Sequence, residues 1–182
     1  MVLLIASDIH GSALYCEKLL YLMKKEQADY LILLGDILYH GPRNDLPEGY
    51  APKKVVAMLN PLKDRILCIQ GNCDAEVDQM VLDFPIINGY QIKNFCGRRI
   101  FLTHGHHYNI NKKPDAGLLD GAGYVIYGHT HIPLKQQIDG IWYLNPGSVS
   151  IPKEDSHRGC IKMTEDKIQW LDLDGTLFDS MP

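Results

Sequence analysis

The chain has 182 residues, of which 46% are hydrophobic and 22% charged, and its formal net charge is −4. This composition is typical of a globular protein and excludes disordered, collagen-like and coiled-coil chains. A chain without a basic excess is not expected to carry a nucleic-acid groove, and the early apolar stretch Val2–Ala6 is too short to span a bilayer or to act as a secretion signal.

Short apolar runs recur along the chain, and each is followed directly by a polar residue that can bind a metal ion. Their aliphatic and β-branched composition predicts buried strands. The runs are Val2–Ser7 before Asp8, Leu31–Gly35 before Asp36, Ile66–Gly71 before Asn72, Ile100–Thr103 before His104 and Val125–Gly128 before His129.

Two helical patterns separate the first three runs. The first spans Ala13–Lys25, and Ser12 is placed to cap its N-terminus. The second begins near Pro52 and stops at Asn60-Pro61. Strands that alternate with helices pair in parallel through right-handed crossovers, so we expect a parallel sheet here.

After Phe84-Pro85 the pattern changes from crossovers to hairpins, which predicts a second sheet. The strand pairs and their turns are Gln91–Phe95 and Arg98–Thr103 around Cys96-Gly97, Leu134–Ile138 and Ile141–Leu144 around Asp139-Gly140, and Gly159–Met163 and Lys167–Leu171 around Glu165-Asp166. We therefore expect one α/β domain over residues 1–182, made of two packed sheets with helices outside and one long irregular loop, Tyr39–Ala51.

Residues two apart follow two of the predicted strands. Because such residues project to the same side of an extended chain, Asp8 and His10 can hold one ion, and His129 and His131 repeat that spacing. Either pair alone more often marks a turn and a surface histidine.

The whole set of strand ends is more specific than either pair. The carboxyl ends of strands in an open α/β sheet form a crevice, and a glycine directly precedes several of the candidate ligands, where it allows a sharp turn and a close approach. We therefore predict a metal centre built from seven residues: Asp8, His10, Asp36, Asn72, His104, His129 and His131.

Short motifs around these residues resemble those of the calcineurin-like metallophosphoesterases: Asp8-x-His10, Gly35-Asp36, Gly71–Asp74, Thr103–His106 and Gly128–His131. Three longer stretches resemble the small bacterial YfcE-type phosphodiesterases of that family: His40–Pro52, Gly71–Met80 and Asn145–Lys153. The resemblance implies a four-layer αββα sandwich of two mixed β-sheets flanked by helices. It also implies a metal-dependent phosphodiesterase that cleaves a small phosphodiester by in-line attack of a hydroxide bridging two divalent ions.

The resemblance further implies how the two ions are held. Asp8, His10, Asp36 and His131 would hold one ion, and Asp36, Asn72, His104 and His129 the other, with the Asp36 carboxylate bridging. Oxygen and nitrogen ligands without a thiolate favour Mn²⁺, with Fe²⁺, Zn²⁺, Ni²⁺ or Co²⁺ as alternatives. Two such cations lower the pKa of a shared water and clamp the phosphate oxygens.

Asn72, Cys73 and His106 are the candidate catalytic residues. Many members of the family carry histidine at the position of Cys73. A thiol with a pKa of about 8.5 is a poor general acid, so we expect a preference for diesters or phenolic esters with good leaving groups. Simple packing is an equal alternative for Cys73. His106 is a candidate to share in acid catalysis or to orient its neighbours, and its neighbour His107 is expected to be exposed without a role.

Several nearby residues allow two interpretations. Arg43 and Asn44 in the long loop are candidate substrate-binding residues, because a guanidinium can bind a phosphate through two hydrogen bonds, although such an arginine more often braces its loop or is solvated. Asp74 is expected to cap a short helix through Met80 rather than to orient a ligand. The segment Asn145–Ser148 is expected to be mainly a shaped turn.

Near the C-terminus, Asp172–Thr176 matches the opening motif of haloacid-dehalogenase-type phosphatases. That chemistry needs a whole α/β domain after the motif, which this chain does not supply. A pair of strands around a tight Asp-Gly turn is therefore the expected structure.

Alternative functions stay open at this point. One is a phosphomonoesterase on the same dinuclear site, and another is a non-catalytic Vps29-like binding scaffold, which the complete set of ligands disfavours. The five cysteines lack CxxC spacing and predict reduced thiols and a cytoplasmic protein. The sequence leaves a homo-oligomer open and indicates neither a nucleic-acid nor a membrane partner.

Overall fold

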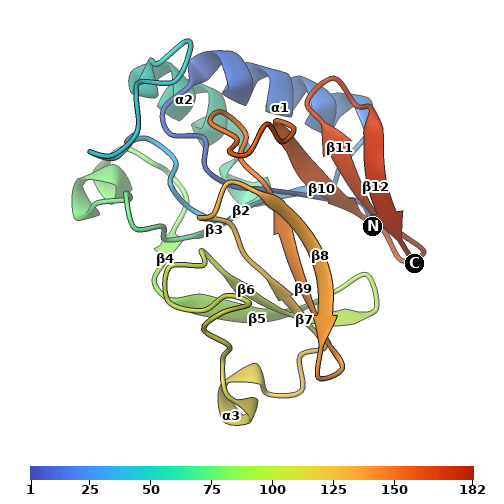
Figure 1. Ribbon diagram of the computed structural model, residues 1–182. Coiled ribbons are helices and arrows are strands. Elements are labelled where there is room, and N and C mark those ends of the chain that lie inside the picture. Colours follow the sequence, from blue (N-terminus) through green and yellow to red (C-terminus); the bar gives the residue numbers. More distant parts are fainter.

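Two β-sheets pack face to face in the computed structural model, which describes residues 1–182, and helices cover the outer face of the larger sheet (Figure 1). The strands are β1 (Leu3–Ala6), β2 (Tyr30–Leu33), β3 (Ile66–Ile69), β4 (Ile86–Ile87), β5 (Tyr90–Phe95), β6 (Arg98–Thr103), β7 (Tyr124–Ile126), β8 (Pro133–Ile138), β9 (Ile141–Pro146), β10 (Gly159–Met163), β11 (Ile168–Asp172) and β12 (Leu177–Met181). The helices are α1 (Ala13–Lys25), α2 (Pro52–Leu59), α3 (Ala116–Leu119) and the 3₁₀ segments η1 (Asn60–Arg65) and η2 (Glu76–Met80).

Both sheets are mixed, as the resemblance implied. The larger sheet has the order β12-β11-β10-β1-β2-β3-β4, in which β1 to β4 are parallel and β10 to β12 antiparallel. The smaller sheet has the order β5-β6-β7-β9-β8, with parallel strands at its centre and a hairpin at each edge. The predicted parallel strands and all three predicted hairpins are confirmed.

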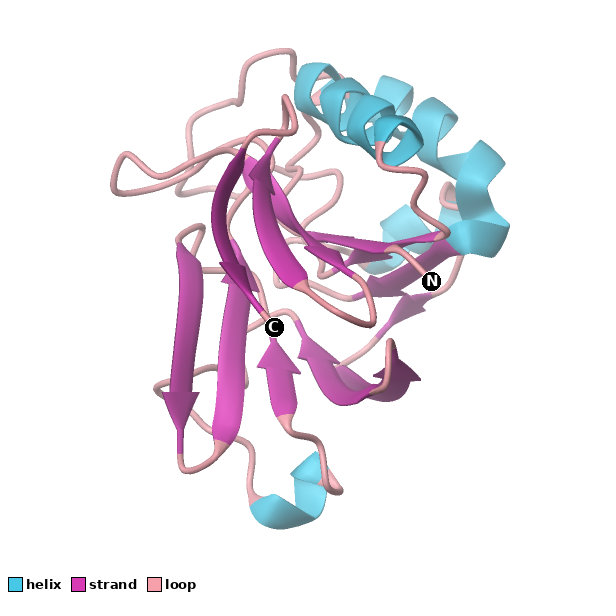
Figure 2. Cartoon of the chain, turned by 90° about the vertical axis from the view of Figure 1, so that its right-hand side faces the viewer, coloured by secondary structure: helices cyan, strands magenta, loops and turns pink.

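The two predicted helices cover one face of the larger sheet (Figure 2). Ser12 caps α1 by accepting a hydrogen bond from the backbone N–H of Tyr15 at 3.3 Å. Helix α2 begins at Pro52, and after its predicted end the chain continues as η1. The apolar face of α1 packs on the sheet, with Leu19 and Leu22 completely buried.

Alternation along β1 shows why the two sheets pack together. Leu4 belongs to the core beneath the helices, whereas Leu3 and Ile5 point into the core between the sheets. The buried Trp170 lies in this second core and donates its Nε1–H to the backbone oxygen of Asn145 at 2.8 Å. Strands buried on both faces explain the continuous apolar runs of the sequence.

The outer face of the smaller sheet has a much thinner cover. Only the single turn α3 and the loop before it lie there, and they enclose a small aromatic core. In that core the ring of Tyr90 stacks on Phe101 with centroids 4.6 Å apart. The expected sandwich of two mixed sheets flanked by helices is confirmed, with its fourth layer reduced to this turn and loop.

Two irregular segments also follow expectation. Residues 39–51 contain no helix, and besides an isolated bridge between Ser12 and Tyr50 they are held by hydrogen bonds from Ser12 and Tyr15 to Glu48. At Asp172–Thr176 a tight turn joins β11 to β12, and the Asp172 carboxylate accepts hydrogen bonds from the N–H groups of Asp174 and Thr176. No helix of the structure is both long enough and apolar enough to cross a bilayer.

Replacing the buried indole tests the packing between the sheets. Trp170→Ala should lower the free energy of unfolding by about 3–5 kcal/mol, because it leaves a cavity in a fully enclosed site. Leu177→Ala, on the half-exposed edge strand β12, should cost no more than about 0.5 kcal/mol.

Urea denaturation followed by both fluorescence and circular dichroism would measure the two changes. Coincident transitions with equal slopes would support the prediction that residues 1–182 form one domain. A Trp170→Ala variant as stable as Leu177→Ala would contradict the assigned packing.

Candidate metal centre

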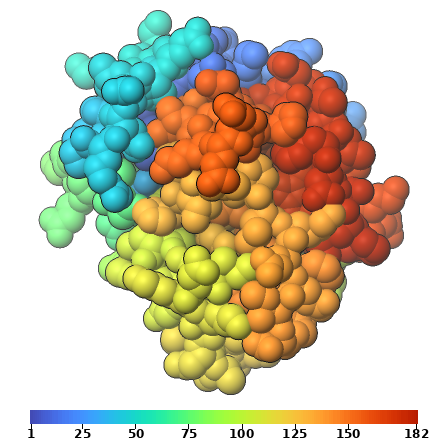
Figure 3. Space-filling view, viewed as in Figure 1, coloured from blue at the N-terminus to red at the C-terminus, as the bar shows by residue number.

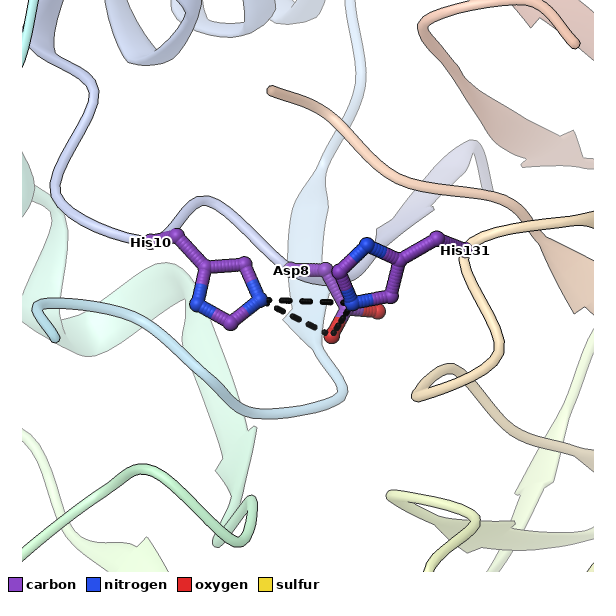
Figure 4. A group of neighbouring side chains, drawn as sticks. All are labelled: Asp8, His10 and His131. Atoms are coloured by element: carbon purple, nitrogen blue, oxygen red, sulfur yellow. Dashed lines mark hydrogen bonds and ion pairs between the residues drawn. The ribbon is translucent and has the colours of Figure 1, made fainter. Parts of the chain in front are cut away.

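The loops at the carboxyl ends of β1 and β7 bring three predicted ligands together (Figure 4). One carboxylate oxygen of Asp8, Oδ1, lies 3.2 Å from Nε2 of His131 and 3.5 Å from Nε2 of His10. The two Nε2 atoms are themselves 3.3 Å apart. Three donor atoms from segments distant in sequence therefore face one common point.

The Asp36 carboxylate connects this group to a second one. Its Oδ2 atom lies 3.7 Å from Nε2 of His10 and 3.5 Å from Nε2 of His104. A single carboxylate oxygen between imidazoles of two clusters is the position that a bridging ligand would take.

Asn72 and His129 complete the second group. The Oδ1 atom of Asn72 lies 3.0 Å from Nε2 of His104, and Nδ1 of His129 lies 3.2 Å from the same nitrogen. The structure therefore places all seven predicted ligands in one continuous cluster.

Three of the imidazoles are fixed by backbone carbonyl groups. The Nδ1 atoms of His10, His104 and His131 lie 2.8, 2.7 and 2.7 Å from the oxygens of Tyr39, Leu34 and Ile151. A ring that donates its Nδ1–H outward presents the lone pair of Nε2 inward, which is the tautomer that binds metal. His129 has the opposite orientation, with Nδ1 inside.

The backbone of the candidate ligands is unusual. Five of them have positive φ angles: Asp8 at 61°, His10 at 49°, Asp36 at 56°, His129 at 66° and His131 at 62°. This left-handed conformation costs side-chain-bearing residues about 1–3 kcal/mol each and persists only where the surroundings impose it. Five left-handed residues in one cluster therefore indicate a functional site, because the fold gains no stability from this conformation.

The chemistry of the donor set fits divalent cations. Oδ1 of Asp8 is buried and accepts no hydrogen bond. The imidazole nitrogens nearest to it present lone pairs, so the atoms that face one another repel unless a cation or protons lie between them. Oxygen and nitrogen atoms make up most of the donor set, which suits first-row divalent ions, and the Sγ atom of Cys73 lies within 4.8 Å of donor atoms of His10 and Asp36.

The pKa values of the cluster also indicate a demand for positive charge. Burial opposes ionisation of Asp8, but the neighbouring imidazoles of His10 and His131 outweigh it and hold its pKa well below the usual value. Burial likewise opposes the charged form of His104, yet the neighbouring carboxylates outweigh it and raise its pKa to about 9. Bound cations would supply the charge that these protons otherwise provide.

Close packing explains the glycines in front of the ligands. A Cβ atom at Gly128 would lie 1.9 Å from Oγ of Ser7, and one at Gly71 would lie 2.1 Å from Oδ1 of Asp36. The loops after β1 and β7, and those after β2 and β3, therefore approach one another too closely for a side chain at either glycine.

The expectation that Asp74 caps the short helix is wrong. Its Oδ2 atom accepts the N–H groups of Asp36 and Gly71 at 2.8 and 2.7 Å, and its Oδ1 atom accepts that of Ile37 at 2.8 Å. Asp78 instead accepts the N–H of Ala75 at the start of η2, at 2.8 Å. Asp74 thus ties the Asp36 loop to the Asn72 loop, and burial, which outweighs these hydrogen bonds, raises its pKa.

Asn145–Ser148 does more than form a turn. Nδ2 of Asn145 donates to the oxygen of Gly128 at 2.8 Å and to Oγ1 of Thr130 at 3.1 Å, and Ser148 donates to the oxygen of Asp8 at 2.9 Å. Both side chains are completely buried. The segment therefore holds the loops of Asp8 and His129 in place. The sequence did not predict this role, although polar residues directly after a buried strand could have indicated it.

Cys73 and His106 border the cluster. The N–H of Cys73 donates to Oδ1 of Asp36 at 2.8 Å, and burial together with that carboxylate raises the pKa of the thiol to about 12. The ring of His106 lies 5.3 Å from that of His104, and burial together with the charge of His104 lowers its pKa to about 4. Near pH 7 the thiol is therefore protonated and His106 is neutral. His107 is exposed, as expected.

A pocket of about 380 Å³ opens over the cluster. It is lined by Asp36, Gly41, Pro42, Arg43, Asn44, Asn72, Cys73, His129, Thr130, His131 and Lys153. Both predicted substrate-binding residues are among them. Asn44 also braces its own loop by donating to the oxygen of His40 at 2.7 Å. A larger groove between α1 and α2, of about 690 Å³, contains none of the predicted site residues.

Comparisons with known proteins agree with this geometry. Residues 1–167 match the family model for the calcineurin-like phosphoesterase superfamily domain. The chain is 48% identical to phosphodiesterase YfcE of Escherichia coli K12 over 153 residues, which cover 84% of this chain and 82% of the relative. It is 25% identical to phosphodiesterase MJ0936 of Methanocaldococcus jannaschii over 150 residues, which cover 79% and 81% of the two chains.

Solved structures share the fold. The structure of YfcE, a phosphoesterase from E. coli, matches with a TM-score of 0.92 and 42% identity over 100% of this chain and 98% of that one. Vacuolar protein sorting 29 from Cryptosporidium parvum matches with a TM-score of 0.62 over 99% and 97% of the two chains. At 17% identity this second likeness shows the fold alone. The resemblance predicted from the motifs is confirmed.

Removing one oxygen from Asp74 tests its positioning role. In Asp74→Asn an amide N–H₂ must face at least one backbone N–H, so the free energy of unfolding should fall by about 1–3 kcal/mol and divalent-metal affinity should fall with it. Urea denaturation in chelator and calorimetric titration with Mn²⁺ would measure the two effects.

Asp83→Asn is the matched control, because the Asp83 side chain is exposed on the same segment. It should change neither quantity. Unchanged metal affinity in Asp74→Asn would mean that the two loops hold their positions without this carboxylate.

Proposed function

We infer that this chain, which belongs to the calcineurin-like phosphoesterase superfamily, is a metal-dependent phosphodiesterase acting on a small phosphodiester. The observation that carries the inference is the position of the Asp36 carboxylate between His10 and His104, at the floor of an open pocket. A relative that is 48% identical over most of its length is a phosphodiesterase.

The chain would hold two divalent cations, and we propose Mn²⁺ for both because no thiolate lies among the ligands. Asp8, His10, Asp36 and His131 would hold one ion, and Asp36, Asn72, His104 and His129 the other. When bound, the pair supplies positive charge that activates water and neutralises the phosphate. Asn72 would contribute an oxygen without adding negative charge.

The remaining pocket residues would bind and orient the ester. Arg43 and Asn44 would contact the phosphate from the loop above the cluster. Neutral His106 can orient a ligand or accept and return a proton, whereas the Cys73 thiol, with its raised pKa, gives little help to a basic leaving group.

We also propose that the protein works in the reducing cytoplasm. All five cysteines are free thiols, and four of them are buried. Thiols that are packed in a core and unpaired suit a reducing compartment.

Asp36→Asn tests the bridging carboxylate. Because replacing a residue that only orients a ligand typically costs about 10- to 100-fold, losing this carboxylate should lower kcat for bis(4-nitrophenyl) phosphate by more than about a hundredfold. The fold should persist, which circular dichroism would check. Lys63→Gln, at the opposite end of β3, is a control that should keep wild-type turnover.

Metal analysis would separate an enzyme from a binding scaffold. Protein stripped with chelator should be inactive and should regain turnover with about two equivalents of Mn²⁺ per chain. Wild-type turnover in Asp36→Asn, or no metal uptake by the stripped protein, would contradict the proposed function.

A substrate panel tests the expected leaving-group preference. Because the Cys73 thiol has a raised pKa of about 12, kcat/KM should be highest for aryl diesters, lower for aryl monoesters and lowest for alkyl monophosphates. Cys73→His should narrow the difference between aryl and alkyl esters by restoring an imidazole acid. Fast hydrolysis of alkyl monophosphates by the wild-type protein would favour a phosphomonoesterase instead.

A further inference from the structure

Two cationic side chains line the pocket without an anionic partner. Arg43 and Lys153 come from different loops, and neither forms an ion pair or a side-chain hydrogen bond. Asp36 is the only acidic residue among those that line the pocket, and it belongs to the metal centre. The rim of the pocket is therefore more basic than one phosphodiester group requires.

The position of Lys153 is fixed by a candidate metal ligand. His131 donates its Nδ1–H to the oxygen of Ile151 at 2.7 Å and accepts the N–H of Lys153 on its own backbone oxygen at 3.1 Å. Ser156 donates to the oxygen of Lys153 at 2.6 Å and closes the turn. The backbone of Lys153 is thus held beside the metal centre, and its side chain is exposed.

The loop that carries Arg43 is fixed by the other histidine of the same group. His10 donates its Nδ1–H to the oxygen of Tyr39 at 2.8 Å. At Gly41 a Cβ atom would lie 2.9 Å from Sγ of Cys73, so this part of the loop packs closely on the site. On the face seen in Figure 3, the blue-to-cyan surface of the 39–51 loop borders the orange surface that follows β9.

The charge of the expected substrate does not account for both cations. A phosphodiester carries one negative charge, which the proposed pair of divalent ions neutralises. Two further cations, held over the same pocket by the histidines of one cluster, suit a second anionic group a short distance from the scissile one. Arginine in particular matches the oxygens of a phosphate.

We propose that Arg43 and Lys153 form a second phosphate-binding element, and that the preferred substrates are phosphodiesters with a further phosphate group on one ester arm. This inference rests on the proposed phosphodiesterase activity. It assigns the two cations a role in substrate selection in addition to any contact with the scissile group.

A matched pair of substrates tests the proposal. Thymidine 5′-(4-nitrophenyl phosphate) would be compared with the same compound carrying a 3′-phosphate, so that both release 4-nitrophenolate when water cleaves the aryl ester. The Mn²⁺-loaded wild-type protein should show a kcat/KM about tenfold higher for the 3′-phosphorylated compound, mainly through a lower KM, and tenfold corresponds to about 1.4 kcal/mol.

The variants use the ratio of the two kcat/KM values as the readout. Arg43→Gln and Lys153→Gln should each reduce the ratio to about threefold or less, and the double variant should bring it near one. Lys63→Gln removes an exposed lysine at the opposite end of β3 and should leave the ratio at the wild-type value. Thermal melting would confirm that each variant is folded.

Results that would contradict the second phosphate site can be distinguished from results that would contradict the phosphodiesterase activity. A wild-type ratio near one, with both compounds hydrolysed, would overturn the second phosphate site and leave the phosphodiesterase standing. If the double variant kept the wild-type ratio of the two kcat/KM values, even with a lower rate, both cations would act only on the scissile phosphate. Hydrolysis of neither compound would overturn the proposed activity and this inference together.

Discussion

The mutual repulsion of Asp8 and Asp36 is the constraint on which the rest of the site depends. Both carboxylates are almost completely buried at the carboxyl ends of adjacent strands. Burial and the negative charge of Asp8 act to raise the pKa of Asp36, but the interaction with His104 outweighs both and lowers it. Two buried anions this close cost free energy unless positive charge lies between them. Protonated imidazoles around the two carboxylates provide part of this positive charge, and bound divalent ions would provide more of it.

That electrostatic cost explains why the surrounding structure is so extensively braced. Asp74 and Ser148 each tie a ligand loop to the backbone of a neighbouring segment, and Gly128 lets the β7 loop touch the β1 loop. The left-handed residues of the cluster add strain that the two cores must offset. The core around Trp170 stabilises the fold, and part of that stabilisation offsets the strain at the site.

Periodicity was enough to predict most strands and the two long helices, because burial of apolar side chains determines them, and the strand ends then located the ligand cluster. The single turn α3 and the short strand β4 were not predicted. They were not enough for Asp74, whose three N–H donors come from two loops that only the folded chain brings together. The same holds for Asn145, which reads as a turn residue until its contact with Gly128 is known. The positive φ angles of Asp8 and the other ligands could not be predicted either, because these residues are not glycines and their types do not indicate a left-handed backbone.

Charge in the pocket follows from where each residue type is placed. The floor holds the Asp36 carboxylate, which attracts cations, whereas Asn72 supplies a neutral amide and the Cys73 thiol keeps its proton. At the rim the charged side chains are Arg43 and Lys153, held through the backbones of loops that His10 and His131 anchor. Because these histidines belong to the metal centre and also hold the backbone of the rim loops, a substrate would meet the outer cations beside the metal centre. This arrangement favours a substrate that carries a second anionic group near the scissile phosphate.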